Sequence, residues 1–217
     1  MITRRPSAAT QQSLTISEEL DNRTGMADGY HELGNLAYLT GDYVEAERRY
    51  QQSLTINEEL GNPAGIASGY HQLGMIAQDR DDYAEAERRY QQSLTIKEEL
   101  GNRAGAATSY HELGNLAYLT GDYAEAERRY QQSLTISEEL GNRAGAATTI
   151  SQLGSLRAET GNPTEAVTLH CRALRSARNR HSPSDEQHCP AAGTTLVARC
   201  ECVLRRGLNR ARRTISA

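Results

Sequence analysis

Apolar residues recur along most of this chain at the spacing of amphipathic helices. Around Leu113 they fall on one side of a helix that we expect over residues 104–119, and around Tyr130 on one side of a helix over residues 123–140. Gly121 lies between the two segments, where the chain has to turn. The pattern therefore predicts a pair of helices joined by a short turn.

Residues that cap helices mark the ends of these segments. Asp122 is followed three residues later by Glu125, which is the capping-box pattern of a helix N-terminus. The same spacing recurs in Asp42 and Glu45, Asp82 and Glu85, and Asn162 and Glu165. Gly61, Gly101 and Gly141 stand where a helix C-terminus favours a left-handed residue. Both signals agree with the helices that the apolar pattern predicts.

The helix pair is repeated along the chain with a period of 40 residues. Residues 30–69 and 110–149 differ at only six of forty positions. We divide the chain into a flexible N-terminus at 1–10, a half repeat at 11–29, full repeats at 30–69, 70–109 and 110–149, a degenerate repeat at 150–180, and a tail at 181–217. A helix pair cannot bury its apolar face alone, so the copies are expected to stack.

A glycine recurs in the middle of each first helix, where it costs about 1 kcal/mol relative to alanine. The residues are Gly34, Gly74, Gly114 and Gly154. Because every copy keeps it, we expect compensation by close helix packing. We expect each glycine to face a small alanine of the paired helix, as Gly34 would face Ala46.

The repeated residues resemble the tetratricopeptide repeat family. Those that match its pattern are Tyr110, Leu113, Gly114, Gly121, Tyr123, Ala126, Tyr130 and Leu134. The resemblance covers about residues 11–180, and the long unit looks most like the extended repeats of the Leu-Gly-Asn polarity adaptors and of bacterial regulators. It implies an all-α fold, a right-handed α-solenoid (superhelix) of antiparallel helix pairs whose first helices line a concave groove.

The resemblance also implies that side chains of the first helices contact a peptide or a helix of a partner protein. Transferred to this sequence, the peptide-binding residues are Asp28, His31, Asn35, Tyr38, His71, Met75, Gln78, His111, Asn115 and Tyr118. An asparagine side chain both donates and accepts hydrogen bonds and can clamp a peptide backbone. The alternative is that nearly identical copies share these residues through recent duplication alone.

The charge of the groove predicts the kind of ligand. Its lining includes Asp28, Asp79 and Glu159 and no lysine or arginine, so we expect a neutral or basic segment. Histidines occupy the places where the family's clamp for terminal carboxylates has basic residues. Binding of a chain terminus is therefore disfavoured.

The sequence offers little for catalysis, metals or cofactors. The three groove histidines lie on helices about 10 Å apart and cannot share one zinc ion. The recurrent pair Glu138 and Glu139 has no histidine nearby, and no phosphate-binding loop or nucleophile motif is present. Cys200 and Cys202 do not have the spacing of a zinc site. We expect a non-enzymatic protein without cofactor or metal.

Composition separates the tail from the body. Residues 1–170 hold 14 Lys and Arg against 25 Asp and Glu, a net charge of −11, whereas residues 171–217 hold 10 Arg against 3 acids, a net charge of +7. The alternative function is therefore binding of nucleic acid or an anionic surface through this tail. The acidic body and the lack of aromatic residues in the tail argue against it.

No apolar run is long enough for a membrane span, and no signal peptide is apparent. We expect a cytoplasmic protein whose four cysteines are reduced.

Both ends of the repeat array carry predictions of their own. Leu14, Ile16 and Leu20 belong to a second helix without its first helix, which predicts self-association through that end or a longer parent array. In the tail, apolar residues at helical spacing predict a capping helix over residues 195–213 that covers Leu174. The alternative is an unfolded tail.

Overall fold

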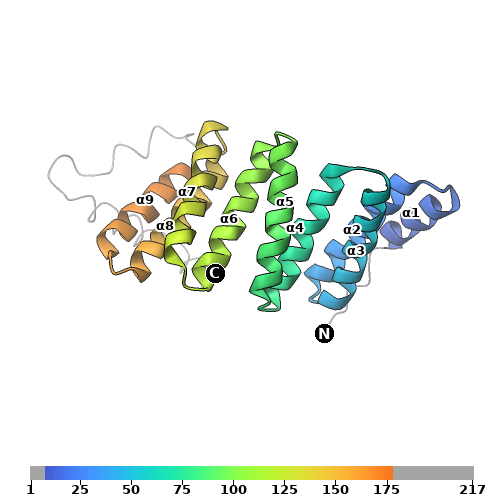
Figure 1. Cartoon of the computed structure of the whole chain (residues 1–217), viewed down its shortest axis with the longest axis horizontal. Coiled ribbons are helices and arrows are strands. Elements are labelled where there is room, and N and C mark those ends of the chain that lie inside the picture. Colours follow the sequence, from blue (N-terminus) through green and yellow to red (C-terminus); the bar gives the residue numbers. More distant parts are fainter. Residues whose placement is uncertain (1–7, 178–217) are drawn as a thin grey trace, which may run out of the picture. The chain divides into compact units, whose positions relative to one another are not determined.

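The structure is a computed structural model that describes residues 8–177, and within this range every regular element is an α-helix (Figure 1). The helices are α1 (Ala8–Glu19), α2 (Arg23–Leu39), α3 (Tyr43–Glu59), α4 (Pro63–Asp79), α5 (Tyr83–Glu99), α6 (Arg103–Leu119), α7 (Tyr123–Glu139), α8 (Arg143–Glu159) and α9 (Pro163–Ala177). We call α2, α4, α6 and α8 the first helices, and α1, α3, α5, α7 and α9 the second helices. The predicted tail helix lies outside the described residues.

The chain divides into two compact units. One ends at Gly121 and contains α1–α6, and the other begins at Asp122 and contains α7–α9. Within each unit, helices that are consecutive in the chain pack on one another, α2 on α3 and α4 on α5 in the first and α8 on α9 in the second. This arrangement confirms the all-α, solenoid type of fold expected from the repeat. None of the helices within residues 8–177 is both long and apolar enough to cross a membrane.

The helix N-termini are capped, in part as predicted. Asp42 accepts a hydrogen bond from the Glu45 amide at 3.1 Å, as the capping box requires. The reciprocal bond is replaced, because the Asp42 amide donates to the Ala37 carbonyl. The carboxylate of Glu45 instead binds Arg48 and Arg49. The first helices are capped by asparagines, among them Asn62, which the proline after it marks as a cap in the sequence. The caps are Asn22, Asn62, Asn102 and Asn142.

The carboxylate between two arginines is held ionised. Hydrogen bonds from Arg48 and Arg49 hold the pKa of Glu45 at about 2. The i,i+4 ion pair that the spacing suggests is therefore formed. Arg49 is half-buried. Its guanidinium lies over the Tyr30 ring, 5.6 Å from the ring centre.

The turns after the second helices use left-handed residues as predicted. Gly61, Gly101 and Gly141 have φ of 61°, 65° and 65°. The turn after α4 needs the same conformation but places Asp81 there, at φ 60°. A left-handed conformation costs a non-glycine residue about 1–2 kcal/mol.

The mid-helix glycines face tyrosine rings, which corrects our expectation of alanine. A Cβ atom on Gly34 would lie 2.6 Å from the ring of Tyr50, and one on Gly74 would lie 2.8 Å from the ring of Tyr90. Both tyrosines are fully buried in the core of the first unit. Each glycine therefore leaves room for the tyrosine ring of the paired helix. Ala46 is buried in the same core but is not the closest neighbour of Gly34.

The second unit repeats this scheme with different residues. Gly154 of α8 faces the ring of His170 of α9, to which a Cβ atom would approach within 2.9 Å. His170 occupies the position of Tyr50 and Tyr90 but is only half-buried.

Cys171 is disulfide-bonded, so the expectation of four reduced cysteines is wrong for this residue.

The lone second helix α1 is better covered than predicted. Leu14 is buried against α2, where Gly29 leaves room for it, so the expectation that Leu14 lacks a cover is wrong. Ile16 and Leu20 are exposed. Self-association through these two side chains stays a prediction.

Candidate functional site: the face of the first helices

All ten predicted site residues lie in the first unit, on α2, α4 and α6. We call the surface that they form the first-helix face: Asp28, His31, Asn35 and Tyr38 on α2; His71, Met75 and Gln78 on α4; and His111, Asn115 and Tyr118 on α6. Asp28 is exposed, and the other nine are half-buried. The face therefore has one exposed residue, Asp28, beside a half-buried set of mostly polar side chains.

Side chains of this polar layer connect neighbouring first helices. His31 Nε2 lies 3.3 Å from Ser68 Oγ, and the Tyr38 hydroxyl donates to Asp79 Oδ2 at 2.6 Å. Gln72 also reaches Asn35, at 3.5 Å. These contacts join α2 to α4 at three levels along their length. The residues predicted to bind a ligand therefore also hold the first helices together.

Asn35 has only part of its hydrogen-bonding capacity left for a ligand. Its Oδ1 accepts a hydrogen bond from the buried Tyr50 hydroxyl at 2.8 Å. Its Nδ2 makes only long contacts of 3.4 Å, to His31 and Glu32. The donor side of the amide is only weakly engaged, whereas the acceptor side already binds the tyrosine of the paired helix.

The histidines are turned toward the helix pairs. The His31 and His71 rings lie 5.6 and 5.4 Å from the rings of Tyr50 and Tyr90. Burial lowers the pKa of His71 to about 4 and lowers the pKa of His111 as well. Both are therefore neutral at neutral pH and add no positive charge to the face.

Three further predicted residues are tied to the core or to a neighbouring helix. Met75 packs against the core of α4–α6. Gln78 Oε1 accepts a hydrogen bond from the Tyr90 hydroxyl at 3.3 Å. Tyr38 is anchored from both ends, by its ring against Tyr43 and by its hydroxyl on Asp79. Burial and the Asp79 carboxylate raise the pKa of Tyr38, so it remains protonated.

The sequence patterns did not indicate that one lysine, Lys97, is buried. Lys97 of α5 is 9% exposed, and its Nζ donates to Ser109 Oγ of α6 at 3.0 Å. Burial lowers its pKa to about 8. The equivalent residues in the other repeats are Ser17, Asn57 and Ser137. The available signal was that Lys97 is the single lysine of the whole sequence.

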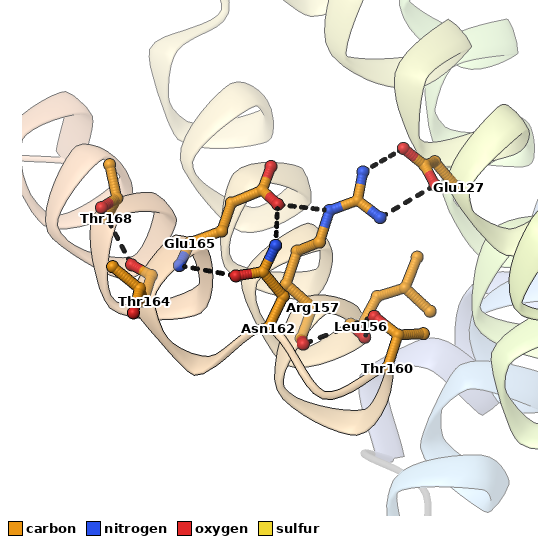
Figure 2. Close-up of polar contacts among 8 residues, drawn as sticks. All are labelled: Glu127, Leu156, Arg157, Thr160, Asn162, Thr164, Glu165 and Thr168. Atoms are coloured by element: carbon orange, nitrogen blue, oxygen red, sulfur yellow. Dashed lines mark hydrogen bonds and ion pairs between the residues drawn. The ribbon is translucent and has the colours of Figure 1, made fainter.

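An ion-pair cluster braces the second unit (Figure 2). Arg157 of α8 binds the carboxylate of Glu127 from α7, and its Nε lies 3.1 Å from Glu165 Oε2 of α9. Asn162, the cap residue of α9, donates to the same Glu165 oxygen at 2.9 Å. Arg157 is largely covered, and both carboxylates belong to neighbouring helices. The cluster therefore joins three helices and has a structural role.

The part of the chain that the structure describes contains no candidate metal site. Between residues 8 and 177, no group of three or more His, Cys, Asp and Glu side chains is placed to hold an ion. The histidines predicted for the face are engaged with serine, asparagine and tyrosine neighbours instead.

Sequence models described as tetratricopeptide repeat match residues 30–64, 65–139 and 120–179. Together with the helix pairs, this places the chain in the tetratricopeptide repeat family. No curated protein matches the sequence.

Solved structures share the fold at low sequence identity. BtubC (BKLC) from P. vanneervenii is 22% identical with a TM-score of 0.71, over 86% of this chain and 75% of that one. A Rap protein complexed with Competence and Sporulation Factor is 18% identical with a TM-score of 0.63, over 76% of this chain and 52% of that one. This chain thus spans about half the length of the Rap protein.

Proposed function

We propose that this chain is a non-enzymatic protein-interaction scaffold that binds a peptide or a helix of a partner protein on the first-helix face. The observation that carries the proposal is the layering of this face. Hydrogen bonds between α2 and α4 fix its inner polar side chains, while Asp28 and the apolar Leu39 and Leu119 are exposed at its edge. A face fixed before binding loses little conformational entropy when a ligand arrives.

Two roles follow for the ten proposed site residues. Asp28 and the accessible edges of Tyr38 and Tyr118 contact the ligand, because aromatic rings give a large contact area with few rotatable bonds. The Nδ2 group of Asn35 donates to a ligand carbonyl. The histidines, Met75 and Gln78 support the face from beneath.

The charges favour a neutral or basic ligand. Asp28 and Asp79 belong to α2 and α4, and none of the residues that define the face is lysine or arginine. Its histidines His71 and His111 are half-buried and neutral. Complementary charge raises the association rate and disfavours acidic partners.

The tetratricopeptide fold and the Rap neighbour support this proposal at the level of the protein class. In that solved structure, a Rap protein is complexed with Competence and Sporulation Factor. A fold of this kind can therefore carry a binding surface for another molecule, and the particular face proposed here rests on the residues of this chain.

The test is a selection of random display peptides on the full chain, followed by affinity measurement for the best binders. We expect the selected peptides to be enriched in lysine and arginine. Asp28→Lys should weaken a selected basic peptide roughly threefold or more, because it reverses a charge beside the ligand. Selection of acidic peptides would contradict the proposal.

A matched control uses the same change of charge elsewhere. Glu87 is exposed on the second helix α5 and is outside the first-helix face. Glu87→Lys should leave the affinity unchanged. Equal losses in the two variants would mean that net charge alone attracts the peptide, and would overturn the assignment of the face.

A further inference from the structure

The first helices of the first unit all end on an exposed residue at the same position of the repeat. The residues are Leu39 in α2, Asp79 in α4 and Leu119 in α6, and we call them the end row. Leu39 is 78% exposed and Leu119 is 51% exposed. A single exposed leucine is ordinary in a globular protein. Two leucines at equivalent helix ends with a carboxylate between them, however, form a pattern that a ligand can recognise.

Contacts between the helices place the members of the end row beside one another. The hydroxyl of Tyr38, the residue before Leu39, donates to Asp79 Oδ2 at 2.6 Å and so joins the end of α2 to that of α4. Ala77 of α4 and Leu116 of α6 belong to one buried core cluster, which brings the ends of these two helices together. Packed helices lie about 10 Å apart, so the end row is about 20 Å long.

Asp79 supplies the end row with a fixed and accessible negative charge. Its Oδ2 accepts the hydrogen bond from Tyr38, whereas its Oδ1 has no partner among residues 8–177. The adjacent Arg80 binds Glu47 of α3 at 2.6 Å and is therefore already paired. An ionised carboxylate with a free oxygen forms a charge-assisted hydrogen bond with an arginine or lysine. The middle of the row therefore favours a basic side chain, and its two ends favour apolar side chains.

The spacing of the end row selects one conformation among extended ligands. In a polyproline II helix every third side chain lies on the same side, and one turn rises about 9 Å, close to the separation of neighbouring first helices. In a β-strand the residues i and i+3 point to opposite faces, so a strand does not place three such side chains on the row. A polyproline II segment therefore places residues i, i+3 and i+6 on Leu39, Asp79 and Leu119.

Hydrogen bonding disfavours an α-helical ligand, although residues i and i+7 of a helix also lie about 10 Å apart on one side. Asn35 lies one turn before Leu39 on α2, and its Nδ2 group is only weakly engaged, at 3.4 Å from His31 and Glu32. The carbonyl groups of a polyproline II segment are unpaired and can accept a bond from this group, whereas those within an α-helix are already bonded. The face therefore favours the polyproline II conformation.

We propose that the end row binds a polyproline II segment that carries an apolar residue at i, an arginine or lysine at i+3 and an apolar residue at i+6. The two apolar side chains contact Leu39 and Leu119, and the basic side chain binds Asp79. The residues between them face solvent, so proline is tolerated there. This inference rests on the proposed function and adds the sequence and the conformation of its ligand.

The experiment measures binding of three synthetic peptides to the full chain by fluorescence anisotropy. The first contains Leu-Pro-Pro-Arg-Pro-Pro-Leu, and the second has the same composition in the order Leu-Pro-Arg-Pro-Pro-Pro-Leu. The third is an alanine-rich helix with leucine, arginine and leucine seven residues apart. We expect the first to bind roughly fivefold more tightly than the others, or more, because only it combines the right spacing with unpaired carbonyls. Equal binding of the first two, or tighter binding of the helix, would contradict the inference.

Variants of the chain identify the carboxylate. Asp79→Asn keeps an oxygen for the Tyr38 hydroxyl but removes the charge, and should weaken binding of the first peptide roughly threefold or more. Glu87→Gln makes the same change on α5, outside the end row, and should leave the affinity unchanged. A peptide with glutamine instead of arginine should bind the unchanged chain and Asp79→Asn equally. Equal losses in the two variants would mean that net charge attracts the peptide, and that the end row is not its site.

Failure of this inference differs from failure of the proposed function. If peptides selected from the random library bind and lose affinity in Asp28→Lys, while the polyproline II peptide does not bind, the proposed function stands and the inference on the end row is wrong. If neither the selected peptides nor the polyproline II peptide binds, both are wrong.

Discussion

The interior helix pairs and the last pair are built on one sequence pattern but differ in what surrounds them. In the first unit, Tyr50 and Tyr90 are fully buried over a glycine of the paired helix. In the last pair, His170 takes the same position over Gly154 and is half-buried. The same repeat position is therefore part of the core in the interior pairs and only partly covered in the last pair.

The largest difference in the free energy of unfolding should appear when the ring that faces the glycine is removed. Tyr90→Ala should lower the free energy of unfolding by about 3–5 kcal/mol, because it leaves a cavity beside Gly74 and Leu113. His170→Ala should cost less than half as much, since water already reaches this ring. Denaturant titrations of the two variants measure both, and equal losses would mean that the last pair is packed like an interior pair.

The leucine position sharpens the comparison within the second unit alone. Leu134→Ala should cost about 2–5 kcal/mol, because that side chain is fully buried. Leu174→Ala should cost about 1 kcal/mol at most, since part of its surface stays accessible. The comparison fails if thermal melts of the full chain shift as far for Leu174→Ala as for Leu134→Ala.

Replacing a mid-helix glycine by alanine tests whether the ring that faces it can move aside. Gly74→Ala should lower stability by about 1–3 kcal/mol, because the new methyl group would meet the buried Tyr90 ring. Gly154→Ala should be close to neutral, because the half-buried His170 can turn away and alanine favours the helix. Chemical denaturation of both variants decides, and a large loss at Gly154 would contradict a mobile His170.

The smallest effect distinguishes two interior repeats. Lys97 is buried where α3 has Asn57, and its pKa of about 8 lies below the ordinary 10.5. Burying the charged amine lowers stability at pH 7, and stability should rise as pH increases from 8 to 10.5, because there the unfolded chain binds more protons.

Lys97→Ser introduces the residue that α1 and α7 have at this position. After discounting for solvent screening, it should raise stability at pH 7 by about 1–2 kcal/mol and remove the dependence between pH 8 and 10.5. Unfolding free energies across this pH range provide the measurement. An unchanged pH profile would mean that Lys97 is solvated.

Local signals made most of the fold predictable. The apolar period, the Asp42 cap and the glycines after the second helices depend on neighbours a few residues away, and they gave the helices and their ends. The packing of Gly34 on Tyr50 instead depends on how two helices are set against each other. A repeat pattern shows that such a glycine matters but does not show which side chain fills its space.

The helices that carry the candidate residues were predictable, but the contacts among these residues were not. The residues predicted on α2 and α4 do lie together, yet Tyr38 is joined to Asp79 and Asn35 to Tyr50. These bonds connect residues up to 41 positions apart, and only the stacked helices reveal them. The cap at Asn62, by contrast, was predictable because it is local: the residue is followed by Pro63, as a cap before a first-turn proline.

Amide hydrogen exchange within the second unit tests most directly whether the last helix pair is less enclosed than an interior pair. The amides of α9 should exchange roughly tenfold or more faster than those of α7, because Leu174 is 43% exposed where Leu134 is 2% exposed. Equal protection of α7 and α9 would contradict the account.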